Sequence, residues 1–194
     1  ARNTKARFPI RKEGLQGSHP RMIMYMSSEG HSCHQKNAET TGLGSDGVHV
    51  IPVNQRFEMD LAALRATIED DLAAGLHPFC VVATVGTVKT GASDDLNAIA
   101  DLCAEHDIWL HVDGAFGALV ALSEKPEHRR LIDGIARSDS LAFDMHKWMS
   151  IPFEAGAVLV RDERAHYKAL TLTPDYLTHA TRGAAGAQTW LSDY

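Results

Sequence analysis

The sequence has little cysteine, no basic excess and no long apolar run, and each absence excludes a class of protein. Its three cysteines form no CxxC pair, so neither a disulfide framework nor a zinc or redox motif of that kind is expected. Reduced thiols in the cytoplasm are the simplest interpretation. The formal net charge of -6 gives no general reason to expect nucleic acid or an anionic membrane surface as a partner. No apolar run approaches the length of a membrane span, and no signal peptide is recognisable.

What is present is typical of a globular domain. A hydrophobic content of 44% and a charged content of 23% allow a sizeable core in a chain of 194 residues. The first residue is not methionine, and the last residues contain no stop or capping signal. We therefore expect a fragment of a longer protein.

The spacing of apolar residues predicts strands that alternate with helices. The clearest helix follows Asp60, whose carboxylate can cap it, and ends before Gly75. Other helices are expected over residues 31–41 and from Asp94 onward. Strands are expected at residues 22–26, 48–53, 79–83, 108–112, 140–143 and 157–160.

This alternation predicts an α/β fold with three layers, in which a mostly parallel sheet carries helices on both faces. Ligands bind beyond the carboxyl ends of the strands in such sheets. The polar groups expected there are Thr84-Val-Gly-Thr87, His111-Val-Asp113 and His146-Lys147-Trp148. Taken singly, each group is explained more readily by helix capping or loop solvation.

Together, Asp113 and Lys147 indicate a specific chemistry. A carboxylate can keep a pyridinium nitrogen protonated, and an amine can form a Schiff base. Pyridoxal phosphate requires these two groups of its protein. The order of the motifs therefore predicts pyridoxal 5'-phosphate as the cofactor.

The sequence also resembles the group II pyridoxal-phosphate-dependent decarboxylases, the family of aromatic-L-amino-acid and glutamate decarboxylases. The resemblance begins near Arg21, covers most of the chain and keeps the family order. Its motifs are Ser27-Ser-Glu-Gly-His31-Ser, Val82-Ala-Thr-Val-Gly-Thr87, Trp109-Leu-His-Val-Asp113-Gly-Ala115-Phe, Asp139-Ser140-Leu-Ala-Phe-Asp144-Met-His146-Lys147-Trp148 and Pro174-Asp-Tyr176-Leu177.

The resemblance implies a fold and a set of catalytic residues. Residues 1–194 would form a partial cofactor-binding large domain of the fold type I transferases. Lys147 would hold the cofactor as an imine, and Asp113 would pair with the pyridinium nitrogen. His31 would stack on the cofactor ring and act in catalysis.

Further cofactor contacts follow from the same resemblance. Ala115 matches the small residue packed on the other face of the ring, and His146 matches the residue that contacts phosphate or substrate. Thr84, Thr87 and Ser140 complete the implied cofactor-binding set. No metal ligand is implied.

The reaction type depends on Tyr176. Residues 171–194 are a candidate catalytic loop and exit toward a missing C-terminal domain. A tyrosine at this place in the family is implicated in protonating the carbanion left by carbon dioxide, whereas relatives with phenylalanine tend toward aldehyde synthesis. The resemblance thus implies decarboxylation of an L-amino acid to an amine.

Several alternatives stay open. Another reaction on the same fold, such as that of an aldehyde synthase or a carbon-sulfur lyase, would give different products, and a non-catalytic fragment would bind no cofactor. The substrate is not fixed, although Trp148 leans toward the aromatic branch. The family also implies a homodimer of the full-length protein.

Some features depart from the family pattern. Val88 stands where many members carry a second threonine. Asp144 stands where aromatic decarboxylases often have asparagine near the phosphate, so it must pair with a cation, point away or contact the cofactor differently. The serine- and alanine-rich turn that cradles the phosphate does not precede His31.

Other apparent motifs carry less weight. Residues 42–47 spell GxGxxG, but they follow a helix and precede a strand, the reverse of the dinucleotide-binding order. A helix cap and turn explain them better. His31-Ser-Cys33-His34 offers metal-ligating atoms at helical spacing, but no second ligand cluster in the sequence completes a zinc site.

Overall fold

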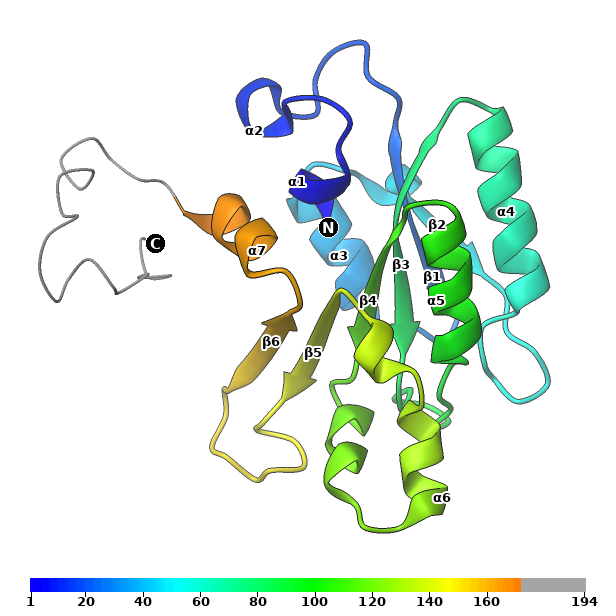
Figure 1. Cartoon of the computed structure of the whole chain (residues 1–194), viewed down its shortest axis with the longest axis vertical. Helices are drawn as coiled ribbons and strands as arrows, with labels where there is room; N and C mark the ends of the chain where they lie inside the picture. The colour runs from blue at the N-terminus through cyan, green and yellow to red at the C-terminus, as the bar shows by residue number, and fades with distance from the viewer. Residues whose placement is uncertain (172–194) are drawn as a thin grey trace, which may run out of the picture. The chain divides into compact units, whose positions relative to one another are not determined.

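The computed structural model describes residues 1–171, and the chain divides into two compact units, Ala1–Arg161 and Asp162–Tyr194. The first unit is built on a six-stranded sheet in the order β2-β1-β3-β4-β5-β6 (Figure 1). Neighbouring strands are parallel except β6, which runs antiparallel to β5. The strands are β1 (Met22–Ser27), β2 (Val48–Ile51), β3 (His77–Thr84), β4 (Trp109–Asp113), β5 (Ser140–Asp144) and β6 (Gly156–Val160).

Helices connect the parallel strands and cover both faces of the sheet (Figure 1). The main ones are α3 (Cys33–Thr40), α4 (Leu61–Ala73) and α5 (Leu96–Glu105). Shorter helices are α1 (Arg2–Lys5), α2 (Ile10–Glu13), α6 (Pro126–Arg129), η1 (Ser45–Gly47), η2 (Gly117–Leu122), η3 (Arg130–Ile132) and η4 (Ile135–Arg137). The expected three-layer, mostly parallel α/β fold is confirmed.

The topology reverses between β1 and β3. The chain leaves β1 for α3 on one face and leaves the adjacent β3 for α5 on the other face. A crevice at the carboxyl ends of two such strands is where open α/β sheets bind ligands. The fold therefore provides a binding position before any side chain is considered.

Two separate apolar clusters flank the sheet. One lies under α4 and α5 and is rich in fully buried aliphatic side chains, such as Leu64, Ile68, Val81 and Leu110. The other lies on the α3 face and includes the β1 methionines together with Phe79. Because successive strand residues point to opposite faces, β1, β3 and β4 each contribute to both clusters.

The prediction for α4 is confirmed in most respects. Asp60 caps the helix and accepts hydrogen bonds from the backbone N–H groups of Ala62 and Ala63. Gly75 follows its end with a φ of 77°, a conformation that glycine adopts without strain. Leu72, which fits the apolar spacing, is nevertheless exposed.

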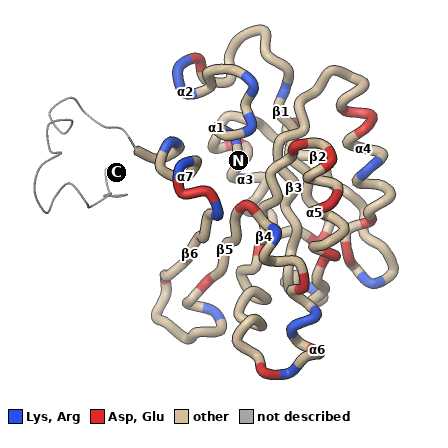
Figure 2. The backbone as a smooth tube through the Cα atoms, viewed as in Figure 1, with Lys and Arg blue, Asp and Glu red and all other residues tan. Residues whose placement is uncertain are grey.

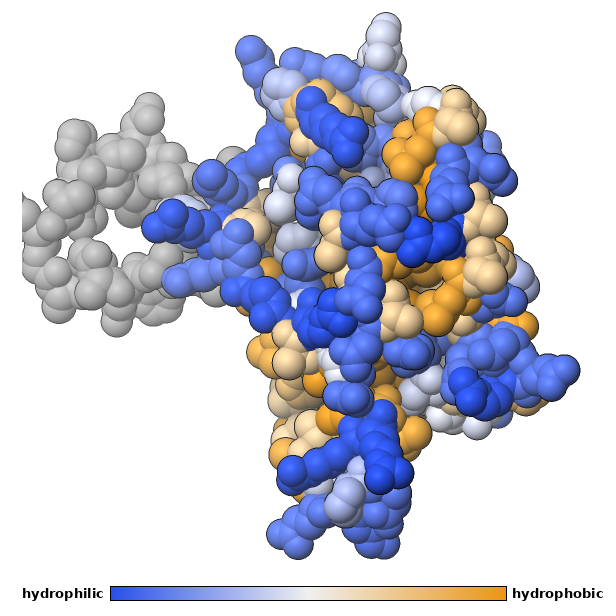
Figure 3. All heavy atoms as spheres, turned by 45° about the vertical axis from the view of Figure 1, so that its right-hand side comes forward, coloured by the Kyte–Doolittle hydropathy of each residue, from blue (hydrophilic) through white to orange (hydrophobic). Residues whose placement is uncertain are grey.

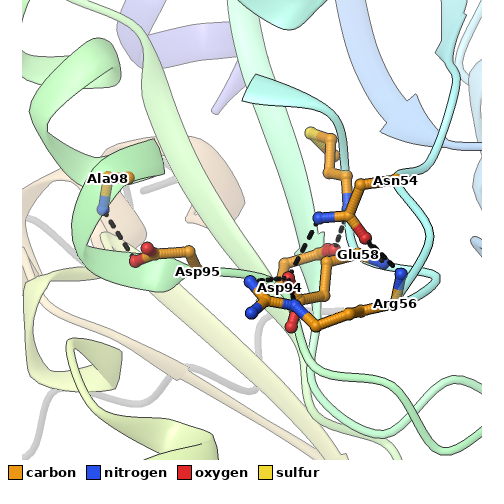
Figure 4. A network of polar contacts seen from close by, with 7 residues as sticks. Asn54, Arg56, Glu58, Asp94, Asp95 and Ala98 are labelled. Carbon is orange, nitrogen blue, oxygen red and sulfur yellow. Dashed lines mark hydrogen bonds and ion pairs between the residues drawn. The ribbon is translucent and has the colours of Figure 1, made fainter. Parts of the chain in front are cut away.

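The expectation that Asp94 opens the next helix is wrong by one residue. Asp95 is the cap and accepts a hydrogen bond from the N–H of Ala98. Asp94 is buried and turns the other way, accepting from the N–H groups of Met59 and Thr84 at 2.7 Å each. Figure 4 shows Asp94 beside the loop that contains Asn54, Arg56 and Glu58, while Asp95 points toward Ala98. Sequence spacing cannot tell two consecutive aspartates apart.

Charged residues lie mainly on the helices and connecting loops (Figure 2). On the side where α4 lies, hydrophilic residues cover most of the surface and hydrophobic ones show in the gaps between them (Figure 3). Within residues 1–171, no helix combines the length and the apolar character that crossing a membrane requires. All three cysteines are free thiols.

The second unit contains α7 (Glu163–Leu170). Asp162 caps this helix by accepting from the backbone N–H groups of Arg164 and Ala165. The predicted catalytic loop, including Tyr176, lies outside the described residues apart from Thr171. Its role stays a prediction.

Candidate active site

A cavity of about 340 Å³ lies at the carboxyl ends of the strands. Its walls come from the segments that follow β1, β3 and β4, from the start of α3, and from β5 and the hairpin after it. The lining residues are Glu29, His31, Cys33, His34, Asn37, Thr84, Gly86, Thr87, Val88, His111, Asp113, Ala115, Phe116, Ala142, Asp144 and Lys147. At least one residue from each of the polar groups predicted at separate strand ends thus lines this cavity.

Asp113 is the last residue of β4 and is 7% exposed. Its Oδ2 lies 2.8 Å from Nε2 of His34, and its Oδ1 accepts from the N–H of Ala115 at 3.1 Å. Burial raises the pKa of the Asp113 carboxyl, but these two hydrogen bonds, together with the electrostatic effect of His34 and His111, outweigh it, and the net pKa lies below its usual value. Asp113 is therefore ionised at neutral pH.

His111 lies two residues before Asp113 and on the same face of β4. Its Nδ1 is 2.8 Å from the hydroxyl of Ser140, which also accepts from the indole N–H of Trp109. Burial, and then the nearby His34, lower the pKa of His111 to about 4. His111 is therefore neutral at neutral pH.

Lys147 lies in the hairpin that joins β5 to β6. Its Nζ is 2.7 Å from Oδ2 of Asp144 and 4.4 Å from the centre of the Phe116 ring. Of the alternatives considered for Asp144, the structure selects pairing with a cation. The amine is thus held at the cavity wall by an ion pair and an aromatic face.

Two predicted contact residues face other groups. Nδ1 of His146 lies 2.9 Å from N of Ala155 and 3.0 Å from its carbonyl oxygen, across the base of the hairpin. The Ser140 hydroxyl is engaged with Trp109 and His111. Neither residue is among those that line the cavity. In this arrangement both hold neighbouring residues in place, and their cofactor roles stay predictions.

The remaining predicted residues do line the cavity. Ala115 follows Asp113, and Thr87 shares a 2.7 Å hydrogen bond with Thr90. His31 is exposed, and its Nδ1 accepts from the N–H of Cys33. The Thr84 hydroxyl is buried and has no hydrogen-bond partner within residues 1–171. A ligand that brought a polar atom to Thr84 would satisfy that hydroxyl.

Sequence reasoning missed His34, which considered alone fits only a metal hypothesis. The structure adds Asp113 to the Cys33-His34 pair, and the ligand atoms of all three lie within 4.8 Å of one another. The 2.8 Å contact between His34 and Asp113 accounts for that pair without an ion. No local signal in the sequence identifies this pair, because Asp113 lies 79 positions away on another element.

Comparison with known proteins identifies the family. The model of the pyridoxal-dependent decarboxylase conserved domain matches residues 3–191. The chain belongs to this family. The predicted relationship to the group II decarboxylases is confirmed, and pyridoxal dependence, a property of the family, agrees with the predicted cofactor.

The matches to individual relatives extend over most of the chain. It is 33% identical to an aromatic-L-amino-acid decarboxylase of Bacillus atrophaeus over 95% of its length, and 41% identical to the human cysteine sulfinic acid decarboxylase over 80%. The crystal structure of Oryza sativa TDC with PLP and tryptamine superposes with a TM-score of 0.79 at 30% identity, over 91% of this chain and 36% of that one. The chain spans 38% and 31% of the two curated relatives.

The residues around the cavity fit the cofactor of this family. An ionised carboxylate, an amine and an unpartnered buried hydroxyl face one space, at Asp113, Lys147 and Thr84. These groups suit a ring nitrogen, an aldehyde and a polar substituent, respectively.

Proposed function

We propose that this chain carries the cofactor site of a pyridoxal-phosphate-dependent enzyme that decarboxylates an L-amino acid to an amine and carbon dioxide. The observation that carries the proposal is that Asp113 and Lys147 line one cavity on one face of the sheet. When bound, pyridoxal phosphate supplies a conjugated pyridinium that takes up the electrons left on the α-carbon as carbon dioxide departs.

Asp113 acts on the ring nitrogen. Its carboxylate is ionised and buried, so it favours a protonated nitrogen placed against it, typically by about 1 to 3 pK units. The bonds from His34 and Ala115 leave lone pairs of the carboxylate available for this contact. Asp113 therefore serves the reaction without changing its own protonation state.

Lys147 attaches the cofactor and moves a proton. An amine must lose its proton before it can attack an aldehyde, and the ion pair with Asp144 at 2.7 Å favours the ammonium, so this pair must separate first. Phe116 limits the directions that the lysine side chain can take. Asp144 thus holds the ammonium of Lys147 at the cavity wall, which a neutral asparagine would do less strongly.

The neighbouring surface supports an aromatic side chain on the substrate. An apolar cavity of about 240 Å³ adjoins the site and shares Gly86, Thr87, Val88 and Phe116 with it. Trp148, which follows the lysine, lies on its wall together with Val85, Val120 and Leu131. An aromatic ring would be buried there against apolar groups. The relatives named above act on both aromatic and acidic amino acids, so this choice needs a direct test.

The first experiment fixes the cofactor to the protein. The chain is incubated with pyridoxal phosphate, reduced with borohydride and digested, and the labelled peptide is identified by mass spectrometry. We expect the label on Lys147, no label in Lys147→Ala, and normal labelling in Lys36→Ala, which removes an exposed lysine of α3. Labelling that persists in Lys147→Ala would contradict the assignment.

The second experiment identifies the reaction. Carbon dioxide, amine and aldehyde are measured across a panel of aromatic, acidic and sulfur-containing L-amino acids. Equal amounts of amine and carbon dioxide from an aromatic substrate are expected. Aldehyde with peroxide would instead indicate an aldehyde synthase, and sulfide would indicate a carbon-sulfur lyase.

A further inference from the structure

His34 and Asp113 form a buried pair that the sequence motifs do not explain. The two residues come from α3 and β4, are 79 positions apart, and are 8% and 7% exposed. Their side-chain atoms approach to 2.8 Å. A buried polar pair of this kind stabilises a specific geometry, because each partner would be costly to bury alone.

The direction of the hydrogen bond follows from the chemistry. An ionised carboxylate can only accept, so Nε2 of His34 donates to Oδ2 of Asp113. The N–H of Ala115 donates to Oδ1. Two donors from different segments therefore fix both oxygens, and the carboxylate cannot rotate freely about its own bonds.

The other titratable side chains near Asp113 are either neutral or paired with another group. His111, on the same strand face, is neutral because burial and His34 lower its pKa to about 4. The Lys147 ammonium is paired with Asp144. Among His34, His111 and Lys147, His34 is the one whose side chain donates a hydrogen bond to Asp113.

We propose that His34 is a positioning residue, which holds the Asp113 carboxylate ionised and oriented toward the cavity. The expected effect on cofactor binding rests on the proposed function. A carboxylate held in one orientation would bind the cofactor ring nitrogen more tightly than one that is free to rotate. His34 itself acts through Asp113 and need not touch substrate or cofactor.

The test begins with the cofactor-free chain. The Asp113 carboxyl is titrated by carbon-13 NMR in the unmodified protein, in His34→Gln and in His34→Leu. The midpoint should rise by about one unit in His34→Leu, because a hydrogen-bond donor to the charged form is lost. His34→Gln keeps a side-chain N–H and should lie between the two.

A matched control separates this effect from a general loss of packing. His77 is also a buried histidine, 7% exposed, but it lies at the start of β3 and contacts the carbonyl oxygen of Lys5 at 2.9 Å. His77→Leu should leave the Asp113 titration unchanged. An unchanged midpoint in His34→Leu, or an equal shift in His77→Leu, would overturn the inference. If His34→Leu does not fold, His34→Gln provides the comparison.

Cofactor affinity is then measured by fluorescence titration. The dissociation constant should rise about tenfold in His34→Leu, because the carboxylate loses the donor that orients it toward the ring nitrogen. An affinity that stays unchanged despite the shifted titration would also overturn the inference. If the unmodified protein does not bind pyridoxal phosphate, the proposed function fails, and the titration alone decides the role of His34.

Discussion

The two faces of β4 show how one strand serves stability and chemistry at once. Leu110 and Val112 point to the α4 and α5 face, where they are 1% and 0% exposed in an aliphatic cluster. Trp109, His111 and Asp113 point to the α3 face and become more polar toward the carboxyl end of the strand. The alternation of a strand thus separates the two tasks by one residue. Substitutions on the two faces should have different effects.

The largest effect is expected on the apolar face, from Leu110→Ala. Truncating a fully buried leucine should lower the free energy of unfolding by about 4 kcal/mol, because it removes apolar burial and leaves a cavity. Urea unfolding measures this change. Val50→Ala, on the exposed edge strand β2, should cost less than about 1 kcal/mol. Weakened cofactor binding by the folded Leu110→Ala protein would contradict the separation of the faces.

Asp113→Asn, on the polar face, should lower activity and leave stability nearly unchanged. The amide cannot stabilise a protonated ring nitrogen as a carboxylate does, so kcat should fall by about 10² to 10³. The acceptor oxygen and the side-chain size are kept, so the melting temperature should change little. Steady-state kinetics and thermal unfolding, measured together, test the contrast. A large loss of stability with near-normal kcat would assign Asp113 to the scaffold.

Asp94→Ala tests a buried carboxylate that joins the end of β3 to the loop after β2. It removes the acceptor of two buried N–H groups, those of Met59 and Thr84, and should lower the free energy of unfolding by about 3 kcal/mol. The adjacent Asp95→Ala removes a helix cap and should cost about 1 kcal/mol. Chemical denaturation of both variants gives the comparison. Equal losses in the free energy of unfolding would mean that the two aspartates contribute equally to stability.

The smallest effect concerns the pH dependence of stability. His111 has a pKa lowered to about 4 in the folded protein, so its folded form resists protonation while the unfolded chain takes up a proton below its ordinary value near 6.5. The contribution of His111 to the free energy of unfolding is complete above about pH 6.5 and is lost as the pH falls toward 4. About 2 kcal/mol is lost by pH 5. His111→Gln should flatten this part of the stability profile. An unchanged profile would show that His111 does not set it.

Much of the fold was predictable, and the reasons lie in particular residues. The continuous apolar runs of β1 and β3 identified buried strands, and Asp60 with Gly75 marked the limits of α4. That Asp113 and Lys147 lie beside one cavity was predictable, because their positions at or just after strand ends follow from local periodicity. Each of these signals is contained within a short stretch of sequence.

What escaped prediction depends on contacts between distant segments. The pairing of His34 with Asp113 needs the position of α3 over β4, and the turn of Asp94 toward Met59 needs the loop after β2. The side chain of His146 contacts the backbone of Ala155 across the hairpin and does not line the cavity. Sequence spacing gives the neighbours of a residue along one element, but not the partner that another element brings to it.

The hairpin after β5 has a consequence for the order in which the site is assembled during folding. Asp144 pairs with Gly156 at the base of the loop that carries Lys147, so the lysine is placed by a contact of short sequence separation. Asp113 and His34 meet only after a much longer loop has closed, which is entropically slower. A complete chain that refolds from the denatured state should therefore place its lysine before the partner of the ring nitrogen is fixed, and tight cofactor binding should report the completion of the long-range fold.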